Sequence, residues 1–484
     1  MLSLPCPVRE MARKHPRKIA LIGPGRELPY AQFDDCVARA EEGLRRFGIA
    51  PGERVGLLAF NSIEYVIGIM SLLRLQACAC PLSTRIPTAT IEEHLDRMRC
   101  RVLLTDGGAR FEGTECLPLL SLAGSTAAAT DVAPASAARP SAAISFSRDR
   151  DATIIWTSGS GGYPKAVLHT FGNHYYSAAG SNENIPVSSA DRWLLSLPLY
   201  HVGGLAILFR CMLAGAAAVL TERRACLSES LERHHVTHVS LVPTQLSRLL
   251  NELSAAHSAP SLKAVLVGGA AVPRGLVGAA YDRGLPVHTS YGSTEMASQI
   301  TTTPPGGDGV SLQSAGRLLS HRELRLADDG EILVRGPTLC RGYVDGERTL
   351  PVVNSEGWFP SGDTGSVDAD GYLTIHGRQD WRFTSGGENI HPEEIVRALC
   401  DLDDVAKAVV VPVDDAEFGQ RPVAFLRMSR GRPLDSAQIA AALEKVLPRF
   451  KIPIAFNPWP DGREPDAMKP QRQTFVERAR QLKL

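Results

Sequence analysis

Residues 18–60 read KIALIGPGRELPYAQFDDCVARAEEGLRRFGIAPGERVGLLAF, and this stretch indicates the fold class. Its opening predicts a pair of strands, and apolar residues then recur at helical spacing. A Pro-Gly turn follows, and the chain next enters an apolar segment typical of a buried strand. Strands and helices that alternate in this way indicate an α/β protein.

The same alternation continues toward the C-terminus. A helix is expected over Glu64–Gln76, followed by apolar segments at Ala77–Pro81 and Arg101–Thr105. These features suit a largely parallel sheet covered by helices. Further strand–helix units are expected to begin at Ala218–Thr221, His238–Val242 and Lys263–Val267. The segment Ala123–Ser145 is rich in Ala, Ser, Thr and Pro, and it reads as a loop or flexible insert.

The pattern changes in the last third of the chain. Short strands and turns are expected from Gly316 to Gly377, and a new α+β pattern begins after Arg378. The elements expected there are helices over Pro392–Leu399 and Ser436–Leu447 and a strand over Ala406–Val411. We therefore expect a large N-terminal α/β domain, residues 1–378, and a smaller α+β domain, residues 379–484. The expected hinge is Gln379-Asp380.

Composition excludes several classes of protein. The 484 residues contain 52 Lys and Arg against 52 Asp and Glu, so no overall field favours nucleic acid or an anionic membrane. The ten cysteines lack the paired spacing of a zinc site and the density of a disulfide-stapled domain, which indicates reduced thiols. No secretory signal and no apolar run of about 18 residues is evident, so we expect a soluble, cytoplasmic protein.

Residues 153–170 read TIIWTSGSGGYPKAVLHT and carry the strongest local signal. Glycines allow backbone N–H groups to face phosphate oxygens, hydroxyls add donors, and the lysine adds a charge. The expected nucleotide-phosphate residues are Thr157, Ser158, Gly159, Ser160, Gly161, Gly162 and Lys165. No Ser or Thr follows Lys165, which disfavours a Walker-type loop. The alternative is a mobile Gly/Ser loop with no ligand.

Residues 194–220 read LLSLPLYHVGGLAILFRCMLAGAAAVL and contain two polar residues of interest. His201 ends an apolar segment beside two glycines, where a core histidine and a functional one are both plausible. Arg210 lies in a long apolar run, and burying a guanidinium costs several kcal/mol unless an anion meets it. Its alternatives are a side chain that reaches the surface or one that pairs with an internal carboxylate.

Residues 287–299 read VHTSYGSTEMASQ and end a predicted strand in a polar turn. An aromatic ring there can stack on a purine, hydroxyls can hold phosphate, and one carboxylate suffices for Mg²⁺, which keeps several waters. The residues concerned are Ser290, Tyr291, Gly292, Thr294 and Glu295. Further on, Asp363 suits a pair of ribose hydroxyls and Arg378 suits a phosphate or an interdomain ion pair. Taken singly, these two could be a β-turn aspartate and a surface arginine.

Together and in this order, these segments resemble the adenylate-forming superfamily of acyl-CoA synthetases, peptide-synthetase adenylation domains and luciferases, over nearly the whole chain. The resemblance implies a large domain with a mobile C-terminal lid. It also implies two half-reactions: a carboxylate and ATP, with Mg²⁺, give an acyl adenylate and pyrophosphate, and a thiol then displaces AMP. Carried over by position, the phosphate loop is Thr157–Lys165, the adenine and magnesium turn Tyr291–Glu295, the ribose aspartate Asp363 and the arginine before the hinge Arg378. Lys469, in GREPDAMKPQR, corresponds to the lid lysine that reaches the α-phosphate and the acid.

Beyond these shared motifs, several sequence segments are similar to those of the 2-succinylbenzoate-CoA ligases of menaquinone biosynthesis. The matching pieces include WLLSLPLYHVGGL, SLVPTQLSRLL, SLKAVLVGGAAVP, FTSGGENIHPEEI and VPVDDAEFGQRPVA. This resemblance implies that Arg210 and Ser240 line the acyl pocket, with His201 and Gly268 beside the acid and Gly269 beside the nucleotide. The catalytic groups it implies are Lys469, Lys165, Glu295 and His201. The partners it implies are small molecules, namely an aromatic dicarboxylate, ATP and coenzyme A, and a homo-oligomer stays open.

Two departures from the superfamily pattern leave alternatives open. Gly161 stands where the phosphate loop usually has a second hydroxyl, whose loss costs on the order of 1 kcal/mol, and Met468 stands where glycine usually precedes the lid lysine. One alternative is another aryl- or acyl-CoA ligase with a different acid. Another is a catalytically weak adenylate-binding protein. A third is a loader of a carrier protein, which is disfavoured because no carrier domain follows the lid.

Overall fold

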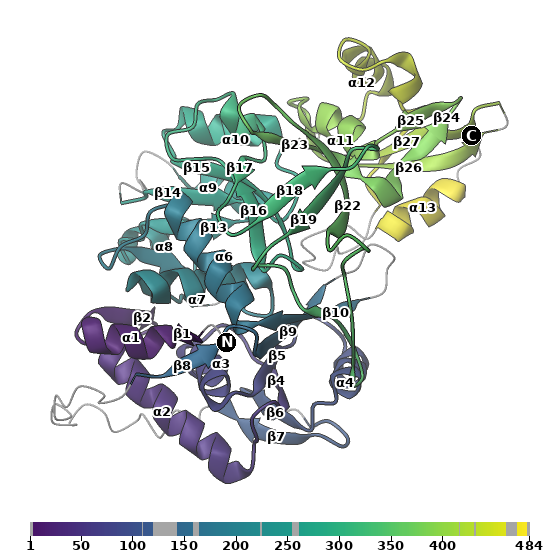
Figure 1. The fold of residues 1–484 in the computed structure, drawn as a ribbon. Coiled ribbons are helices and arrows are strands. Elements are labelled where there is room, and N and C mark those ends of the chain that lie inside the picture. The colour runs from purple at the N-terminus through teal and green to yellow at the C-terminus, as the bar shows by residue number, and fades with distance from the viewer. Residues whose placement is uncertain are drawn as a thin grey trace.

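The computed structural model describes residues 3–108, 110–119, 143–157, 164–222, 225–253, 261–415, 417–429, 432–460 and 472–481. Figure 1 shows two sheets flanked by helices that make up most of the chain, with a smaller group of strands and helices near the C-terminus. The α/β class expected from the sequence is confirmed by this arrangement. The expected loop at Ala123–Ser145 falls outside the described residues, except for its last three residues.

Eight described strands form the first sheet, in the order β21-β20-β10-β9-β5-β4-β6-β7. Their bounds are β4 Arg54–Leu58, β5 Cys78–Pro81, β6 Val102–Thr105, β7 Glu115–Pro118, β9 Asp151–Thr157, β10 Lys165–Thr170, β20 Gly342–Asp345 and β21 Arg348–Leu350. The strands from β9 through β7 are parallel to their neighbours, as the sequence predicted. The pairs β9–β10, β10–β20 and β20–β21 are antiparallel and extend this sheet toward the nucleotide motifs.

Nine described strands form the second sheet, in the order β17-β16-β15-β14-β13-β11-β12-β2-β3. Their bounds are β2 Ile19–Gly23, β3 Arg26–Pro29, β11 Arg192–Leu194, β12 Ala217–Val219, β13 His238–Leu241, β14 Ala264–Val267, β15 Val287–Ser293, β16 Ser298–Thr302 and β17 Arg317–Leu318. The run from β2 to β15 is parallel, and antiparallel hairpins close both edges. A separate pair joins β1 (Ser3–Pro5) to β8 (Ser145–Ser147).

Helices cover both sheets and pack in three hydrophobic clusters, the largest of which lies between the two sheets. They are α1 Pro7–Lys14, α2 Tyr30–Phe47, α3 Ile63–Leu75, α4 Thr88–Met98, α6 Phe171–Asn184, α7 Val202–Ala214, α8 Leu227–Arg233, α9 Pro243–Glu252 and α10 Arg274–Asp282. Helix α3 is apolar on every side, and such a helix is stable only when it is surrounded by protein. It begins at the N-cap Ser62, whose hydroxyl accepts the Tyr65 N–H at 3.0 Å. Helices α2, α3 and α7 pack with residues of both sheets in a single cluster, so the two sheets are held firmly to each other.

The last part of the chain forms two further sheets. Strands β18 (Glu323–Leu326), β19 (Glu331–Arg335), β22 (Phe359–Val367) and β23 (Leu373–Arg378) make an antiparallel four-stranded sheet. After a short turn at Gln379–Trp381 come β24 (Phe383–Ser385), β25 (Glu388–Ile390), α11 (Pro392–Cys400), β26 (Val405–Asp415), β27 (Gly419–Met428), α12 (Ser436–Leu443), β28 (Ala455–Pro458) and α13 (Arg472–Arg480). This group has its own cores on the two sides of the β26–β27 hairpin. The proposed boundary after Arg378 therefore coincides with the end of a strand.

One expected element is longer than the structure has it. Helix α12 ends at Leu443, whereas the sequence predicted a helix through Leu447. Leu447 precedes Pro448, and a residue before proline is disfavoured in the helical region, so the last turn unwinds. Across the described residues, none of the helices combines the length and the apolar character that a membrane span requires.

Candidate active site

The hairpin of β15 and β16 lies at the centre of the predicted site residues. At Gly292 a Cβ would stand 2.0 Å from the carbonyl oxygen of Ser298, so only glycine allows the two strands to approach this closely. Ala297 and Ser298 have φ of +53° and +122°, a region that residues with side chains seldom adopt. The Ser177 hydroxyl donates to the Ala297 carbonyl at 2.7 Å and holds this turn. Such backbone conformations gather at functional sites.

The first cluster on the hairpin joins Tyr291, Asp363 and Arg378. The Tyr291 hydroxyl donates to Asp363 Oδ2 at 2.6 Å, and Arg378 NH1 lies 3.2 Å from Asp363 Oδ1. Asp363 and Arg378 face each other across the β22–β23 pair, which fixes their spacing. Burial, reinforced by the Asp363 carboxylate, raises the pKa of Tyr291 well above its usual value, so the hydroxyl stays a donor. The structure thus brings together three residues that lie far apart in the sequence.

The second cluster joins Glu295 to Lys165 through a residue that the sequence did not indicate. The Tyr343 hydroxyl donates to Glu295 Oε1 at 2.8 Å, and Lys165 Nζ stands 4.7 Å from the centre of the Tyr343 ring. Burial and the neighbouring Glu295 raise the pKa of Tyr343. His169 Nε2 bonds to the Thr294 carbonyl at 2.7 Å, which ties the hairpin to β10. Nothing around Tyr343 in the sequence distinguishes it from an ordinary strand tyrosine.

The two ends of the predicted phosphate loop are held side by side. Thr157 and Lys165 are direct partners in the antiparallel β9–β10 pair. Residues Ser158, Gly159, Ser160, Gly161 and Gly162 lie outside the described residues, and so does Lys469. Their predicted roles stay predictions.

The third cluster surrounds Arg210, which α7 places in the interior. Its side chain is almost completely buried, with the residue 1% exposed. Arg210 NH2 donates to Gln299 Oε1 at 2.5 Å and lies 3.4 Å from Ser298 Oγ, and the guanidinium stands over the Trp193 ring at 5.1 Å. Burial lowers the pKa of Arg210 to about 10, so it remains charged at neutral pH. Its Nε has no hydrogen-bond partner among the described residues.

The surface alternative for Arg210 is therefore wrong, and the described residues give no support to the alternative of an internal carboxylate partner. The side chain does not reach the surface, and its described partners are all neutral. Another buried arginine of this chain shows the contrast: Arg74 NH2 pairs with Asp34 Oδ1 at 2.6 Å, and both side chains are 2% exposed. Within the described part of the chain, Arg210 is thus a buried guanidinium with an unbonded N–H and no carboxylate partner, and such a group is open to an anionic ligand.

Trp193 connects Arg210 to Ser240. The Trp193 Nε1–H donates to the Ser240 hydroxyl oxygen at 3.1 Å, while the His238 ring stacks on the indole at 5.0 Å. The indole can only donate, so the Ser240 hydroxyl accepts from it and keeps its own proton for another acceptor. Arg210 and Ser240, which the sequence assigned to the acyl pocket, thus contact the same indole. The sequence around Trp193 did not indicate this role, because a buried tryptophan is common in protein cores.

The remaining predicted residues lie around these clusters. Gly268 and Gly269 follow β14, and a Cβ at Gly268 would stand 2.5 Å from Ser290 Oγ, while Gly269 has φ of +79°. Ser290 Oγ itself donates to the Val267 carbonyl at 3.1 Å. His201 precedes the first residue of α7, and its ring packs against Tyr200 at 4.7 Å. His201 lies nine positions before Arg210, which corresponds to about 13.5 Å along the helix axis.

No group of three or more His, Cys, Asp and Glu side chains that could hold a metal gathers within the described part of the chain. A site for Mg²⁺ built on Glu295 would therefore use one protein carboxylate, with phosphate oxygens and water completing the shell. This donor set fits Mg²⁺, which is usually bound in this way beside nucleotides.

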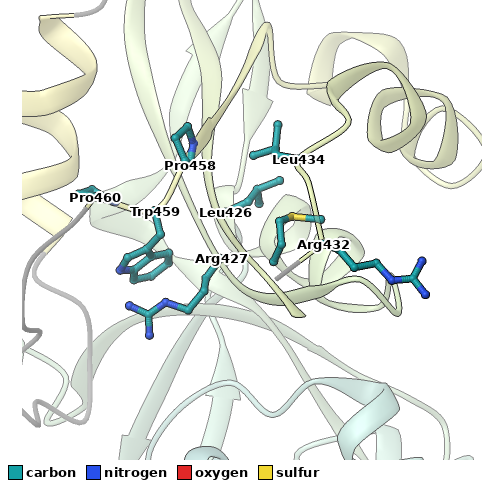
Figure 2. Close-up of a pocket in the computed structure, with 8 residues that line it drawn as sticks. Leu426, Arg427, Arg432, Leu434, Pro458, Trp459 and Pro460 are labelled. Atoms are coloured by element: carbon teal, nitrogen blue, oxygen red, sulfur yellow. The ribbon is translucent and has the colours of Figure 1, made fainter. Parts of the chain in front are cut away.

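Two open cavities among the described residues contain none of the predicted site residues. One, of about 350 Å³, lies in the C-terminal group of strands, where Trp459, Arg427 and Arg432 line it together with apolar residues (Figure 2). The other, of about 360 Å³, lies between Arg26, Asn61 and Glu222. Neither changes the placement of the candidate site at the β15–β16 hairpin.

Comparison with known proteins gives concordant results. Residues 8–344 match the model of the AMP-binding enzyme family. The 2-succinylbenzoate–CoA ligase of Geobacillus kaustophilus is 33% identical over 470 residues, which cover 94% of this chain and 93% of that protein. The solved structure of o-succinylbenzoate CoA synthetase from Bacillus subtilis with the acyl-adenylate intermediate OSB-AMP aligns with a TM-score of 0.87 at 30% identity over 98% of each chain. The same enzyme with ATP and magnesium ion aligns with a TM-score of 0.84 at 30% identity, over 94% of this chain and 96% of that one.

Proposed function

Because this chain belongs to the AMP-binding enzyme family, we propose that it converts 2-succinylbenzoate to 2-succinylbenzoyl-CoA through an acyl adenylate, with release of AMP and pyrophosphate. The reaction is that of an ATP-dependent acid–thiol ligase and supplies menaquinone biosynthesis. Three residue clusters on one hairpin support the proposal, since a nucleotide and an acid must meet at the reacting phosphorus.

The nucleotide half of the proposal rests on the first two clusters. Asp363, held by Tyr291 and Arg378, presents carboxylate oxygens suited to the two ribose hydroxyls. Lys165 and the loop that starts at Thr157 are proposed to hold the β- and γ-phosphates. Lys469 is proposed to reach the α-phosphate and the acid, where negative charge builds up as the adenylate forms. When bound, Mg²⁺ would neutralise phosphate charge beside Glu295.

Arg210 carries the acid half of the proposal. The substrate keeps one carboxylate while its other carboxylate is activated, and a buried guanidinium with an unbonded N–H suits the one that it keeps. Ser240 offers its hydroxyl proton on the other side of Trp193 to a further oxygen of the acid. His201 and Gly268 are proposed to stand beside the acid, and Gly269 beside the nucleotide.

The thiol half-reaction requires coenzyme A to reach the adenylate, which the proposed lid, residues 379–484, would allow by rotating at Gln379-Asp380. Arg378 stands at this junction and contacts both sides of it, because its NH2 lies 3.1 Å from Asp380 Oδ2 while its NH1 contacts Asp363. At least one of these two hydrogen bonds of Arg378 would have to break when the proposed lid rotates.

A panel of acids tests the proposed function. AMP formation with ATP, Mg²⁺ and coenzyme A is measured with 2-succinylbenzoate, benzoate and fatty acids. We expect kcat/KM to be highest for 2-succinylbenzoate. A higher value for benzoate or a fatty acid would make the chain a different acyl-CoA ligase, and absence of pyrophosphate release with every acid would indicate an adenylate-binding protein of little activity.

For Glu295→Gln we expect the Mg²⁺ concentration at half-maximal rate to rise by about tenfold or more, which corresponds to about 1.4 kcal/mol. The proposed site has one protein carboxylate, and glutamine removes its charge at constant shape. The measurement is a magnesium titration of the adenylation rate at saturating ATP.

Tyr343→Phe is the matched control for this titration. It removes the hydrogen bond to Glu295 Oε1 and leaves the carboxylate, so its magnesium requirement should rise less than that of Glu295→Gln. An unchanged titration for Glu295→Gln would remove this residue from the metal site.

A further inference from the structure

Gln299 is a buried amide whose contacts fix its orientation. It lies on β16 and is 4% exposed. Its Oε1 accepts from Arg210 NH2 at 2.5 Å and from the Ser181 hydroxyl at 2.8 Å, and its Nε2 donates to Thr302 Oγ1 at 2.5 Å. A guanidinium offers only donors, so the amide oxygen has to face Arg210. The guanidinium is thereby held at one nitrogen, while its Nε is left without a described partner.

A second buried guanidinium adjoins the same residue. Arg322 is 6% exposed, and its Nε donates to the main-chain oxygen of Gln299 at 2.7 Å. Its other nitrogens donate to the main chain of Ser320 and to Ser177. Burial, together with the positive charge of Arg210, lowers the pKa of Arg322 to about 9. Arg322 is satisfied by neutral protein oxygens, whereas Arg210 is not.

Two positive charges thus meet at Gln299, and no carboxylate bonds to either one among the described residues. The acidic side chain that acts on Arg322 is Glu183, which lies 3.5 Å from His321 and is 56% exposed. Proteins ordinarily pair a buried guanidinium with a carboxylate, as Arg74 is paired with Asp34 in this chain. A glutamate at position 299 would have the volume of the glutamine and would complete such a pair.

We propose that Gln299 determines the charge preference of the acid site: as a neutral amide it positions Arg210 without cancelling its charge, which reserves that charge for an acid carrying a second carboxylate. This inference rests on the proposed function. A glutamate in the same place would form an internal ion pair, repel the second carboxylate and turn the site toward acids with a single carboxylate. Gln299 is thus a positioning and specificity-determining residue, which acts on the acid through Arg210.

The test compares wild type with Gln299→Glu on three acids. They are 2-succinylbenzoate and the two monoacids obtained by replacing one or the other of its carboxylates with a methyl group. The quantity measured is kcat/KM for the diacid divided by kcat/KM for the better monoacid, so any loss of folded protein cancels. We expect this ratio to fall by about 30-fold or more in Gln299→Glu, because a carboxylate now faces a carboxylate. The melting temperature should rise, because a buried arginine gains a charged partner.

Gln299→Met is the matched control. It removes the hydrogen bonds of the amide without adding charge, so the preference for the diacid should fall much less than in Gln299→Glu. A Gln299→Glu enzyme that keeps the wild-type ratio overturns the inference, and so does a Gln299→Met enzyme that loses the ratio to the same extent. If wild type itself shows no preference for the diacid over the monoacids, the proposed function fails, which separates the two failures.

Discussion

Arg210→Ala should reduce kcat/KM for 2-succinylbenzoate by about 30-fold to 5,000-fold, which corresponds to a loss of transition-state stabilisation of roughly 2 to 5 kcal/mol. The change leaves the second carboxylate of the substrate buried without a partner, beside the Trp193 ring and Gln299. The KM for ATP should hardly change, because the nucleotide clusters are built on other residues of the hairpin. Arg210→Lys should restore only part of the loss, since a compact ammonium cannot make the planar two-pronged contact. Steady-state AMP formation measures all three effects.

Arg74→Ala is the control for the loss of a buried arginine. Arg74 pairs with Asp34, so its removal should lower the melting temperature and leave the preference among acids unchanged. If Arg210→Ala likewise lowers the melting temperature and leaves the preference among acids unchanged, Arg210 has a structural role. The alternative function, an aryl-CoA ligase for a different acid, would then be favoured. An equal loss toward acids that lack the second carboxylate would also contradict the carboxylate clamp, because those acids give the guanidinium nothing to bind.

Lys469→Ala should slow adenylate formation by about 10²- to 10³-fold, while thiol transfer from a supplied acyl adenylate stays nearly intact. The lysine charge is needed where negative charge builds up on the α-phosphate during adenylation, whereas thiol transfer is proposed to follow rotation of the lid that carries Lys469. Pyrophosphate exchange measures the first half-reaction, and thioester formation from synthetic acyl adenylate measures the second.

The control is Lys445→Ala, which replaces an exposed lysine of the same C-terminal group and should leave both half-reactions unchanged. Comparable losses in the two half-reactions of Lys469→Ala would contradict the assignment of Lys469 to adenylation. The test also bears on Met468, which stands where glycine usually precedes the lid lysine. If Lys469→Ala slows the first half-reaction, Lys469 reaches the phosphate even though methionine allows the backbone less freedom than glycine.

Local patterns in the sequence predicted the elements well. The family prediction is confirmed by the match over residues 8–344 and by relatives that cover more than 90% of the chain. The strands at Cys78–Pro81, His238–Leu241 and Ala264–Val267 begin or end within a residue or two of their predicted bounds, because apolar runs between turns leave little freedom. The helix that ends at Leu443 was predicted to be too long, because periodicity does not register Pro448, five residues further on.

The contacts that build the site were mostly beyond the sequence. Arg210 was singled out because a guanidinium in an apolar run is unusual, and the structure shows that its side chain is buried. Its partners Trp193 and Gln299 come from strands β11 and β16, and the sequence around them does not indicate that they meet Arg210. Tyr343 was missed for the same reason, since the strand that carries it pairs with β10 across a long stretch of chain. Long-range pairing, and not local propensity, decides which side chains meet.

The tight hairpin at Gly292 and Ser298 has a consequence for attempts to engineer the enzyme for new acids. Its backbone couples the turn that carries Glu295 to the strand that carries Gln299, so an insertion or a bulky residue at Gly292 or Ser298 would disturb catalysis and substrate choice together. Side chains on α7 and β11 can be exchanged without altering that backbone. A combinatorial library aimed at new substrates should therefore vary Arg210, Trp193 and the Gln299 side chain, and keep the length of the hairpin constant.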